Sequence, residues 1–204
     1  RQKMIPVVCP AYLPNVQYFQ WLLKQEKVYF SSSDHYQKQT FRNRTAIYGA
    51  NGKLNLTIPI AHHSNTHVHD IDVVISDTIP WQQQHWKSFC AAYRSAPFFE
   101  FYEDAFYPFY HRPQTCLFEF NINLIEEILT LLEIDWEYHC VPFEQEKHQR
   151  MEALILAKNQ KTPSFPAYTQ VFSNKYGFIP NLSVVDVLFN LGPETEAYLR
   201  NNPS

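Results

Sequence analysis

The chain has 204 residues, of which 45% are hydrophobic, and its formal net charge is −3. The apolar content excludes a disordered chain, and the acidic balance argues against a broad electrostatic contact with DNA or with an anionic membrane. No apolar run reaches the roughly 18 residues that a membrane span needs. The length fits one large domain or two small ones.

The cysteines are widely spaced and form no Cys-x-x-Cys motif; they are Cys9, Cys90, Cys116 and Cys140. No signal peptide is visible at the start of the sequence. We therefore expect reduced, mostly buried thiols in a cytoplasmic protein.

The first thirty residues predict a strand, a helix and a second strand. Met4–Val8 is a short apolar run, and apolar residues then follow at helical spacing after Pro14, which can open a helix. This spacing predicts a helix over residues 15–25, and Val28–Phe30 is typical of a strand. Together they predict a βαβ unit.

A β-hairpin is predicted next, because Asn51-Gly52 is the strongest turn signal in the chain. Residues 44–48 would form its first strand. Apolar and polar residues alternate from Leu54 to Ile60, which predicts a half-buried second strand. The same alternation from Ile71 to Ile75 predicts a further strand.

Helical spacing dominates the second half of the chain. Helices are predicted from residue 82 to 93 and across the aromatic segment 98–110, where Phe98, Phe101, Tyr102 and Phe106 would share one stripe. The best helix pattern covers residues 117–132. A return strand is expected over 136–141 and a short helix around 151–158.

The tail carries start and stop signals for one more helix. Ser183 and Asp186 fit a capping box, and Gly192-Pro193 would end the helix. The fold class predicted from all elements is α+β, with a small mixed sheet from residues up to about 76 packed against a mainly helical C-terminal half. We expect one domain over residues 1–204, with a boundary near residue 80 as the alternative.

Several segments in order carry a resemblance to a known family. They are PAYLPNVQYF, YQKQTFRNR with the following NGKLNLTIPI, WQQQHWKSFCAAYRSAPFFEFYED, and YTQVFSNKYGFIPNLSVVDVLFNLGPE. Spanning roughly residues 9 to 192, they make the chain resemble the WbqC-like protein family. The family usually has glutamine before its first proline, where this chain has Cys9. That departure weakens any claim for a role of the side chain at position 9.

The resemblance implies a place in bacterial surface polysaccharide or O-antigen biosynthesis. It also implies a group transferase, moving a glycyl or other amino-acyl group to an activated sugar that is a small molecule or lipid-linked. A charged tRNA stays open as the donor, and the sequence names neither a cofactor nor an oligomeric state. The alternative is a non-catalytic protein of the same pathway that binds a sugar nucleotide or a partner enzyme.

Arg42, Asn43 and Arg44 are the first candidates for substrate binding. Two guanidinium groups and an amide can hold a phosphate or carboxylate, and in a strand Arg42 and Arg44 would share one face. Tyr12 suits stacking on a sugar ring, with core packing as the alternative. Arg94, near the acids of the aromatic segment, is a further candidate.

The predicted catalytic residues are His85 and Asp186, because acyl transfer to an amine or hydroxyl needs a base. A surface position for His85 and helix capping by Asp186 are the alternatives. Asn181, close to Asp186 in the sequence, joins the substrate-binding set. A transferase would be expected to bring Tyr12, the Arg42–Arg44 segment and Asp186 into one deep pocket.

Two other features are given no catalytic role at this stage. One is a polar cluster at His62, His63, His67, His69, Asp70 and Asp72. Its residue types suit zinc, but the spacing fits no standard site, so we predict an ordinary loop and no metal ligand. The other is Cys9, a poor nucleophile candidate without an activating histidine nearby. The chain also lacks a P-loop, a GxGxxG motif and a GxSxG elbow.

Overall fold

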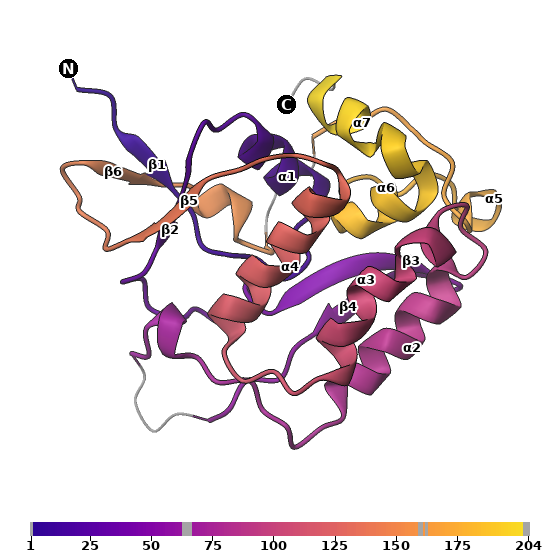
Figure 1. Ribbon diagram of the computed structural model, residues 1–204, viewed down its shortest axis with the longest axis horizontal. Coiled ribbons are helices and arrows are strands. Elements are labelled where there is room, and N and C mark those ends of the chain that lie inside the picture. The colour runs from indigo at the N-terminus through magenta and orange to yellow at the C-terminus, as the bar shows by residue number, and fades with distance from the viewer. Residues whose placement is uncertain (1, 63–66, 159–160, 162, 202–204) are drawn as a thin grey trace.

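The computed structural model describes residues 2–62, 67–158, 161 and 163–201, and Figure 1 shows the arrangement of its elements. The strands are β1 (Ile5–Val7), β2 (Val28–Ser31), β3 (Arg44–Gly49), β4 (Gly52–Thr57), β5 (Tyr138–Val141) and β6 (His148–Arg150). The α-helices are α1 (Val16–Leu23), α2 (Trp81–Tyr93), α3 (Phe99–His111), α4 (Leu117–Leu131), α5 (Ser173–Tyr176), α6 (Val184–Leu191) and α7 (Thr195–Asn201). Short 3-10 turns are η1 (Asp70–Asp72), η2 (Glu152–Leu154) and η3 (Gly192–Glu194).

Two parallel strand pairs lie on one side of the molecule, at the left of Figure 1. Strand β1 pairs with β6, and β2 pairs with β5, each in parallel. A parallel bridge between Val8 and Phe30 joins the two pairs. Helix α1 connects β1 to β2, so the predicted βαβ unit is confirmed.

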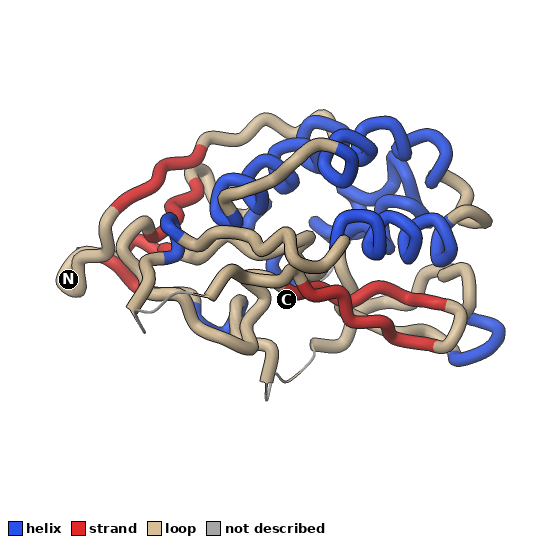
Figure 2. Tube along the Cα trace, turned by 90° about the horizontal axis from the view of Figure 1, so that it is seen from below, coloured by secondary structure: helices blue, strands red, loops and turns tan. Residues whose placement is uncertain are grey.

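The predicted hairpin is also confirmed, as β3 and β4 pair antiparallel with Gly49 opposite Gly52. Gly52 has φ +100°, a conformation that glycine adopts without steric cost. Helices α2 and α6 contact β3. Figure 2 shows most helices as a layer on one side, with the hairpin lying along that layer.

Residues 14–16 at the start of α1 contact residues 182–184 at the start of α6. Asn15 caps α1 by accepting a hydrogen bond from the backbone of Tyr18, and Ser183 caps α6 in the same way. An antiparallel bridge joins Asn15 to Ser183. Backbone hydrogen bonds from Val16 to Leu182 (3.1 Å) and from Val184 to Pro14 (2.8 Å) extend this contact. The first and last family segments therefore lie side by side.

Two predicted elements take another form, because tertiary partners outweigh local pattern. The strand expected from Ile71 to Ile75 is replaced by η1 and single bridges, and η1 begins at Asp70, which is held in a buried ion pair. The helix expected around 151–158 is replaced by η2, because Met151 donates to the carbonyl of Val7 and Phe41 donates to that of Ile155.

One residue of the aromatic stripe predicted for α3 is wrong. Phe101 is 77% exposed, whereas Phe99 is buried together with Tyr102 and Phe106. Helix α7 was not predicted, because Gly192-Pro193 forms a 3-10 turn that leads directly into it.

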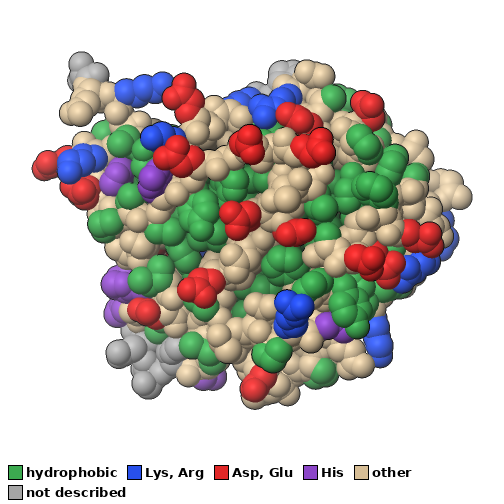
Figure 3. Space-filling view, viewed as in Figure 1, with side chains coloured by type: hydrophobic (Ala, Val, Ile, Leu, Met, Phe, Trp, Pro, Cys, Tyr) green, Lys and Arg blue, Asp and Glu red, His purple; other side chains and the backbone are tan. Residues whose placement is uncertain are grey.

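The α+β fold class is confirmed, with helices mainly in the middle and C-terminal parts of the chain. The sheet prediction needs one correction, because β5 and β6 come from the second half rather than from residues before 76. No helix in the described ranges is both long and apolar enough to cross a membrane. On the face shown in Figure 3, acidic side chains are dispersed among apolar ones, and lysine and arginine form no continuous patch.

Candidate functional site

Pockets between the family segments separate the predicted site residues into groups. The Cys9 pocket, of about 260 Å³, is lined by Val7, Val8, Cys9, Asp34, His35, Gln37, Arg42, Arg150, Met151, Glu152, Ile155 and Leu156. The Tyr12 pocket, of about 220 Å³, includes Tyr12, Asn15, Thr45, Lys53, Asn181 and Ser183. The Arg44 pocket, of about 750 Å³, includes Tyr36, Lys38, Asn43, Arg44, Ile58, Ile60, His62, Val68 and Val73.

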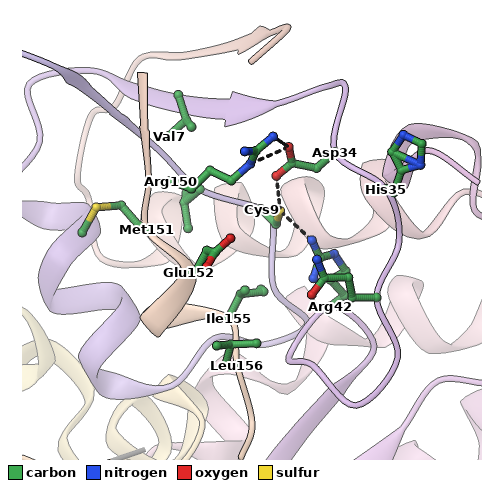
Figure 4. Close-up of a pocket in the computed structure, with 12 residues that line it drawn as sticks. Val7, Cys9, Asp34, His35, Arg42, Arg150, Met151, Glu152, Ile155 and Leu156 are labelled. Carbon is green, nitrogen blue, oxygen red and sulfur yellow. Dashed lines mark hydrogen bonds and ion pairs between the residues drawn. The ribbon is translucent and has the colours of Figure 1, made fainter. Parts of the chain in front are cut away.

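Figure 4 shows Cys9 between a carboxylate and a guanidinium. The Cys9 thiol donates to Oδ2 of Asp34 at 3.4 Å, and Nη2 of Arg42 donates to the Cys9 sulfur at 3.1 Å. Arg42 also donates through Nε to both carboxylate oxygens of Asp70 at 2.9 Å. On the other side, Arg150 donates through Nε and Nη2 to Oδ1 of Asp34.

This cluster is buried at its centre and open at its rim. Cys9, Asp34, Arg42 and Asp70 are each exposed by 8% or less. The Arg150 side chain is 40% exposed, and its guanidinium lies 3.5 Å over the ring of Phe143. The polar groups therefore form one wall of a pocket that solvent reaches past Arg150.

Burial raises the pKa of Cys9 well above its ordinary value, and the charge of Arg42 acts in the opposite direction. Burial also acts to raise the pKa of Asp34, but hydrogen bonds from Arg150, Ser31 and Cys9 together with the charge of Arg150 outweigh it, and the pKa lies below its ordinary value. At neutral pH the pair is therefore a protonated thiol donating to an ionised carboxylate.

The Arg44 pocket is the largest of the three and combines positive charge with apolar walls. Lys38 and Arg44 line it, together with Ile58 and Ile60. The Nε atom of Arg44 and the Oδ1 atom of Asn43 are buried and have no hydrogen-bond partner among the described residues. Buried polar atoms are rarely left unpaired, so these two atoms point to a ligand in this pocket.

The predicted shared face of Arg42 and Arg44 is wrong, because β3 begins only at Arg44 and Arg42 lies before it. Arg42 turns to the Cys9 pocket, and Arg44 turns to its own pocket. Loop residues 35–39 stand between them: His35 and Gln37 line the Cys9 pocket, and Tyr36 lines the Arg44 pocket.

His85 lies in the core and not at the surface, with 4% exposure. Its Nε2 is 3.1 Å from the carbonyl oxygen of Thr57, which only accepts, so Nε2 carries the proton. Its Nδ1 then accepts from the Tyr12 hydroxyl at 2.8 Å, and Tyr110 lies 2.8 Å beyond Tyr12. Burial lowers the pKa of His85 to about 4.

Asp186 is fully buried, with 0% exposure. Its carboxylate accepts from Tyr93 at 2.9 Å, from Tyr168 at 2.6 Å and from Gln170 at 3.0 Å. Burial raises its pKa, and these hydrogen bonds oppose the rise. Arg94 lies on the surface, where it pairs with Glu103 at 2.8 Å.

The expected single pocket is therefore not formed by the described residues. Tyr12 and Asn181 do meet in one pocket, and Asn43 and Arg44 meet in another. Neither Asp186 nor His85 lines any of these three pockets, and the structure does not test a catalytic role for either.

Part of the histidine cluster comes together in the fold. The ring of His35 lies 5.5 Å from that of His67 and 4.7 Å from that of His69. Within the described ranges, no group of three or more His, Cys, Asp or Glu has the geometry to hold a metal ion. His63 lies outside the described residues.

Sequence reasoning missed Asp34, Arg150 and Glu152 as pocket residues. No spacing signal could have found them, because Asp34 and Arg150 stand 25 and 116 positions from their partners Cys9 and Asp34. The parallel pairing of β1 with β6 places Arg150 opposite Val7, two residues before Cys9.

Comparison with known proteins gives the family. The profile of the WbqC-like protein family matches residues 9–162 and 141–198. An uncharacterized protein of Mycobacterium tuberculosis (strain ATCC 25618 / H37Rv), Rv1507c, is 25% identical over 97% of this chain and 98% of its own length. No solved structure matches the chain. Since the profile covers most of the sequence, including the segments around all three pockets, the chain belongs to the WbqC-like protein family.

Proposed function

We propose that the chain is a group transferase that binds an activated, phosphorylated sugar in the Arg44 pocket, in the assembly of a bacterial surface polysaccharide. The pathway and the glycyl or amino-acyl group rest on the family resemblance. The substrate class rests on one observation: Arg44 lines a pocket of about 750 Å³, and its buried Nε has no partner within the part of the chain that the structure describes.

The chemistry of the pocket fits such a ligand. A guanidinium with free donors binds phosphate oxygens in pairs, and the lysine at position 38 adds a second positive charge. The apolar walls at Ile58, Ile60 and Val73 suit the flat face of a nucleoside or sugar. A nucleoside diphosphate sugar combines both parts.

Calorimetric titration with nucleoside diphosphate sugars tests this proposal. Hydrogen bonds to charged groups contribute about 1.5–3 kcal/mol, so Arg44→Ala is expected to weaken binding by about 10–100-fold. Arg112→Ala is the matched control, because it removes the same charge from an exposed position outside the Arg44 pocket and should leave affinity unchanged.

An equal loss of affinity in both variants would mean that the overall positive charge, and not the position of Arg44, determines binding. That result would contradict the pocket assignment. Binding that survives Arg44→Ala intact would contradict it as well. A lipid-linked diphosphate sugar is tested in the same way, with the soluble headgroup analogue as the titrant.

One observation favours a second candidate, a non-catalytic sugar-nucleotide-binding protein. Among the described residues that line the Arg44 pocket there is no carboxylate, and His62 is the one histidine. A binding protein needs no acid–base pair there. The two functions differ in turnover: both predict binding through Arg44, but only the transferase consumes an acyl donor.

A further inference from the structure

We propose that Asn43 determines the ligand specificity of the Arg44 pocket, where its Oδ1 atom accepts a hydrogen bond from a neutral hydroxyl or N–H group of the phosphorylated ligand. This inference rests on the proposed function, because it adds a second contact in the same pocket. Arg44 and Asn43 then recognise two different parts of one ligand, the charged phosphate and an uncharged donor group.

The backbone at Asn43 continues the hairpin beyond its last strand residues. Arg44 pairs with Thr57 at the end of the β3–β4 ladder, and next to this pair the Ile58 amide donates to the Asn43 carbonyl at 2.7 Å. The carbonyl of Ile58 in turn accepts from the side-chain Nδ2 of Asn43 at 2.9 Å. Two hydrogen bonds therefore hold Asn43 to Ile58, one through its backbone and one through its side chain.

These contacts fix the direction in which the side-chain amide of Asn43 faces. A carbonyl oxygen only accepts hydrogen bonds, so the amide presents its NH₂ group to the carbonyl of Ile58. The reversed amide would bring two oxygen atoms together and lose this bond. The Oδ1 atom is therefore an acceptor, and its polarity is set by the hairpin.

This acceptor has room for one more partner. Asn43 is 7% exposed, and within the described ranges no donor reaches its buried Oδ1 atom. A buried polar atom without a partner costs free energy, so native folds rarely keep one unless another group compensates for it. Because Asn43 lines the Arg44 pocket, a ligand in that pocket can supply the missing hydrogen.

The charges around the pocket decide which kind of donor fits. Lys38 and Arg44 line it, and none of its described lining residues carries a carboxylate. An ammonium group would meet two positive charges there without a counter-ion, and nothing would offset its loss of water. A hydroxyl or an amide N–H brings the same hydrogen without a charge. A nucleoside diphosphate sugar has such groups in its sugar and in its nucleoside.

The test is a calorimetric titration with ligands that share a phosphate and differ in their neutral donors. UDP-glucose has donors in both parts, UDP has them only in its nucleoside, and glucose 1-phosphate has them only in its sugar. The symmetric dimethyl ester of diphosphate has no hydroxyl and no N–H. All titrations are done slightly above neutral pH, where the phosphates are ionised.

Asn43→Leu removes both polar side-chain atoms at similar size, and it should weaken the binding of UDP-glucose about tenfold. The dimethyl ester should bind unchanged, because it has no hydrogen to donate. A loss that is shared by UDP assigns the donor to the nucleoside, and a loss that is shared by glucose 1-phosphate assigns it to the sugar. Asn55→Leu is the matched control, since Asn55 is exposed on β4 outside the pocket and should leave each affinity unchanged.

An equal loss for all of these ligands in Asn43→Leu would mean that Asn43 acts only through the fold, which would overturn this inference and leave the proposed function intact. An unchanged affinity for UDP-glucose would overturn it as well. Arg44→Ala should weaken every ligand, including the dimethyl ester. If Arg44→Ala weakens none, or if the unaltered chain binds none, the proposed phosphate site itself is wrong.

A melting curve shows whether Asn43→Leu is folded, and a second measurement does not depend on that variant. In the unaltered chain labelled with nitrogen-15, the Nδ2 resonance of Asn43 responds to a new hydrogen bond at Oδ1, because both atoms belong to one conjugated amide. UDP-glucose should shift this resonance clearly further than the dimethyl ester does. Equal shifts would assign the change to the phosphate charge alone and contradict the inference.

Discussion

At the scale of single residues, burial decides which protonation state each polar side chain holds. His85 stays neutral because its ring is enclosed and its Nε2 proton is used on the Thr57 carbonyl. Its other nitrogen accepts the hydrogen bond of the Tyr12 hydroxyl, so both ring nitrogens are engaged by protein groups. The residue type alone suggested His85 as a base, but nothing in the sequence pattern indicated that its ring would be enclosed.

Stability should therefore depend on the protonation of His85. The pKa of His85 is about 4 in the folded chain and about 6.5 when unfolded. Between these values only the unfolded chain binds the proton, so the free energy of unfolding falls as the pH falls through this window. From pH 7 to pH 5 we expect a loss of about 2 kcal/mol from this group, measured by urea unfolding.

His85→Gln should flatten this part of the pH dependence, although the variant is less stable at pH 7. His139→Gln is the control, because His139 is an exposed partner of Glu137. A pH dependence that is the same in His85→Gln and in the unaltered chain would contradict the assignment.

We expect Asp186 to contribute mainly to the stability of the fold. Asp186→Asn replaces an acceptor of three hydrogen bonds by an amide that has only one oxygen, so donors from Tyr93, Tyr168 and Gln170 compete for it. We expect a loss of about 2–4 kcal/mol in the free energy of unfolding.

Tyr168→Phe removes a single donor and should cost about 1–2 kcal/mol. If Asp186→Asn instead unfolds like the unaltered chain and loses only transfer activity, the predicted catalytic role is favoured over the structural one.

At the scale of elements, the sequence predicted those whose signals are local. The turn at Asn51-Gly52, the cap at Ser183 and the helical face of α4 all act within a few residues, and the structure has each of them. The predictions of a strand from Ile71 to Ile75 and of a helix around 151–158 were wrong because the decisive contacts are not local. The backbone groups of these segments bind partners far along the chain, which a pattern of apolar residues does not report.

Gly192, at the end of α6, has no room for a larger residue. It ends α6 at φ +54°, and an added Cβ would lie 2.5 Å from Cδ1 of Phe98. Gly192→Ala should therefore lose at least about 2 kcal/mol, from backbone strain together with overpacking.

Gly177→Ala is the matched comparison for Gly192→Ala, because it has φ +75° but no atom within 4 Å of the added Cβ. It should lose only about 1 kcal/mol. Urea unfolding of both variants measures the difference, and equal losses would rule out the contact with Phe98 as a cause.

At the scale of the whole molecule, the fold class and the family could be predicted from the sequence. Which predicted site residues share a pocket could not. The family segments supplied Tyr12, Asn43, Arg44 and Asn181 as pocket residues, but which of them share a pocket depends on where β3 begins and how the start of α1 meets the start of α6. The Cys9 cluster is assembled from four separate segments. Cysteine at position 9 therefore gained its chemical setting only through the fold.

The parallel pairing of β1 with β6 also has a consequence during synthesis of the chain. β1 leaves the ribosome before its partner residues His148–Arg150, which emerge much later. β2 likewise waits for Tyr138–Val141. Contacts this distant in sequence form slowly, and unpaired strand edges attract other chains in the meantime. The nascent protein therefore carries two open strand edges until these partners emerge, so its yield should depend on chaperones that shield them.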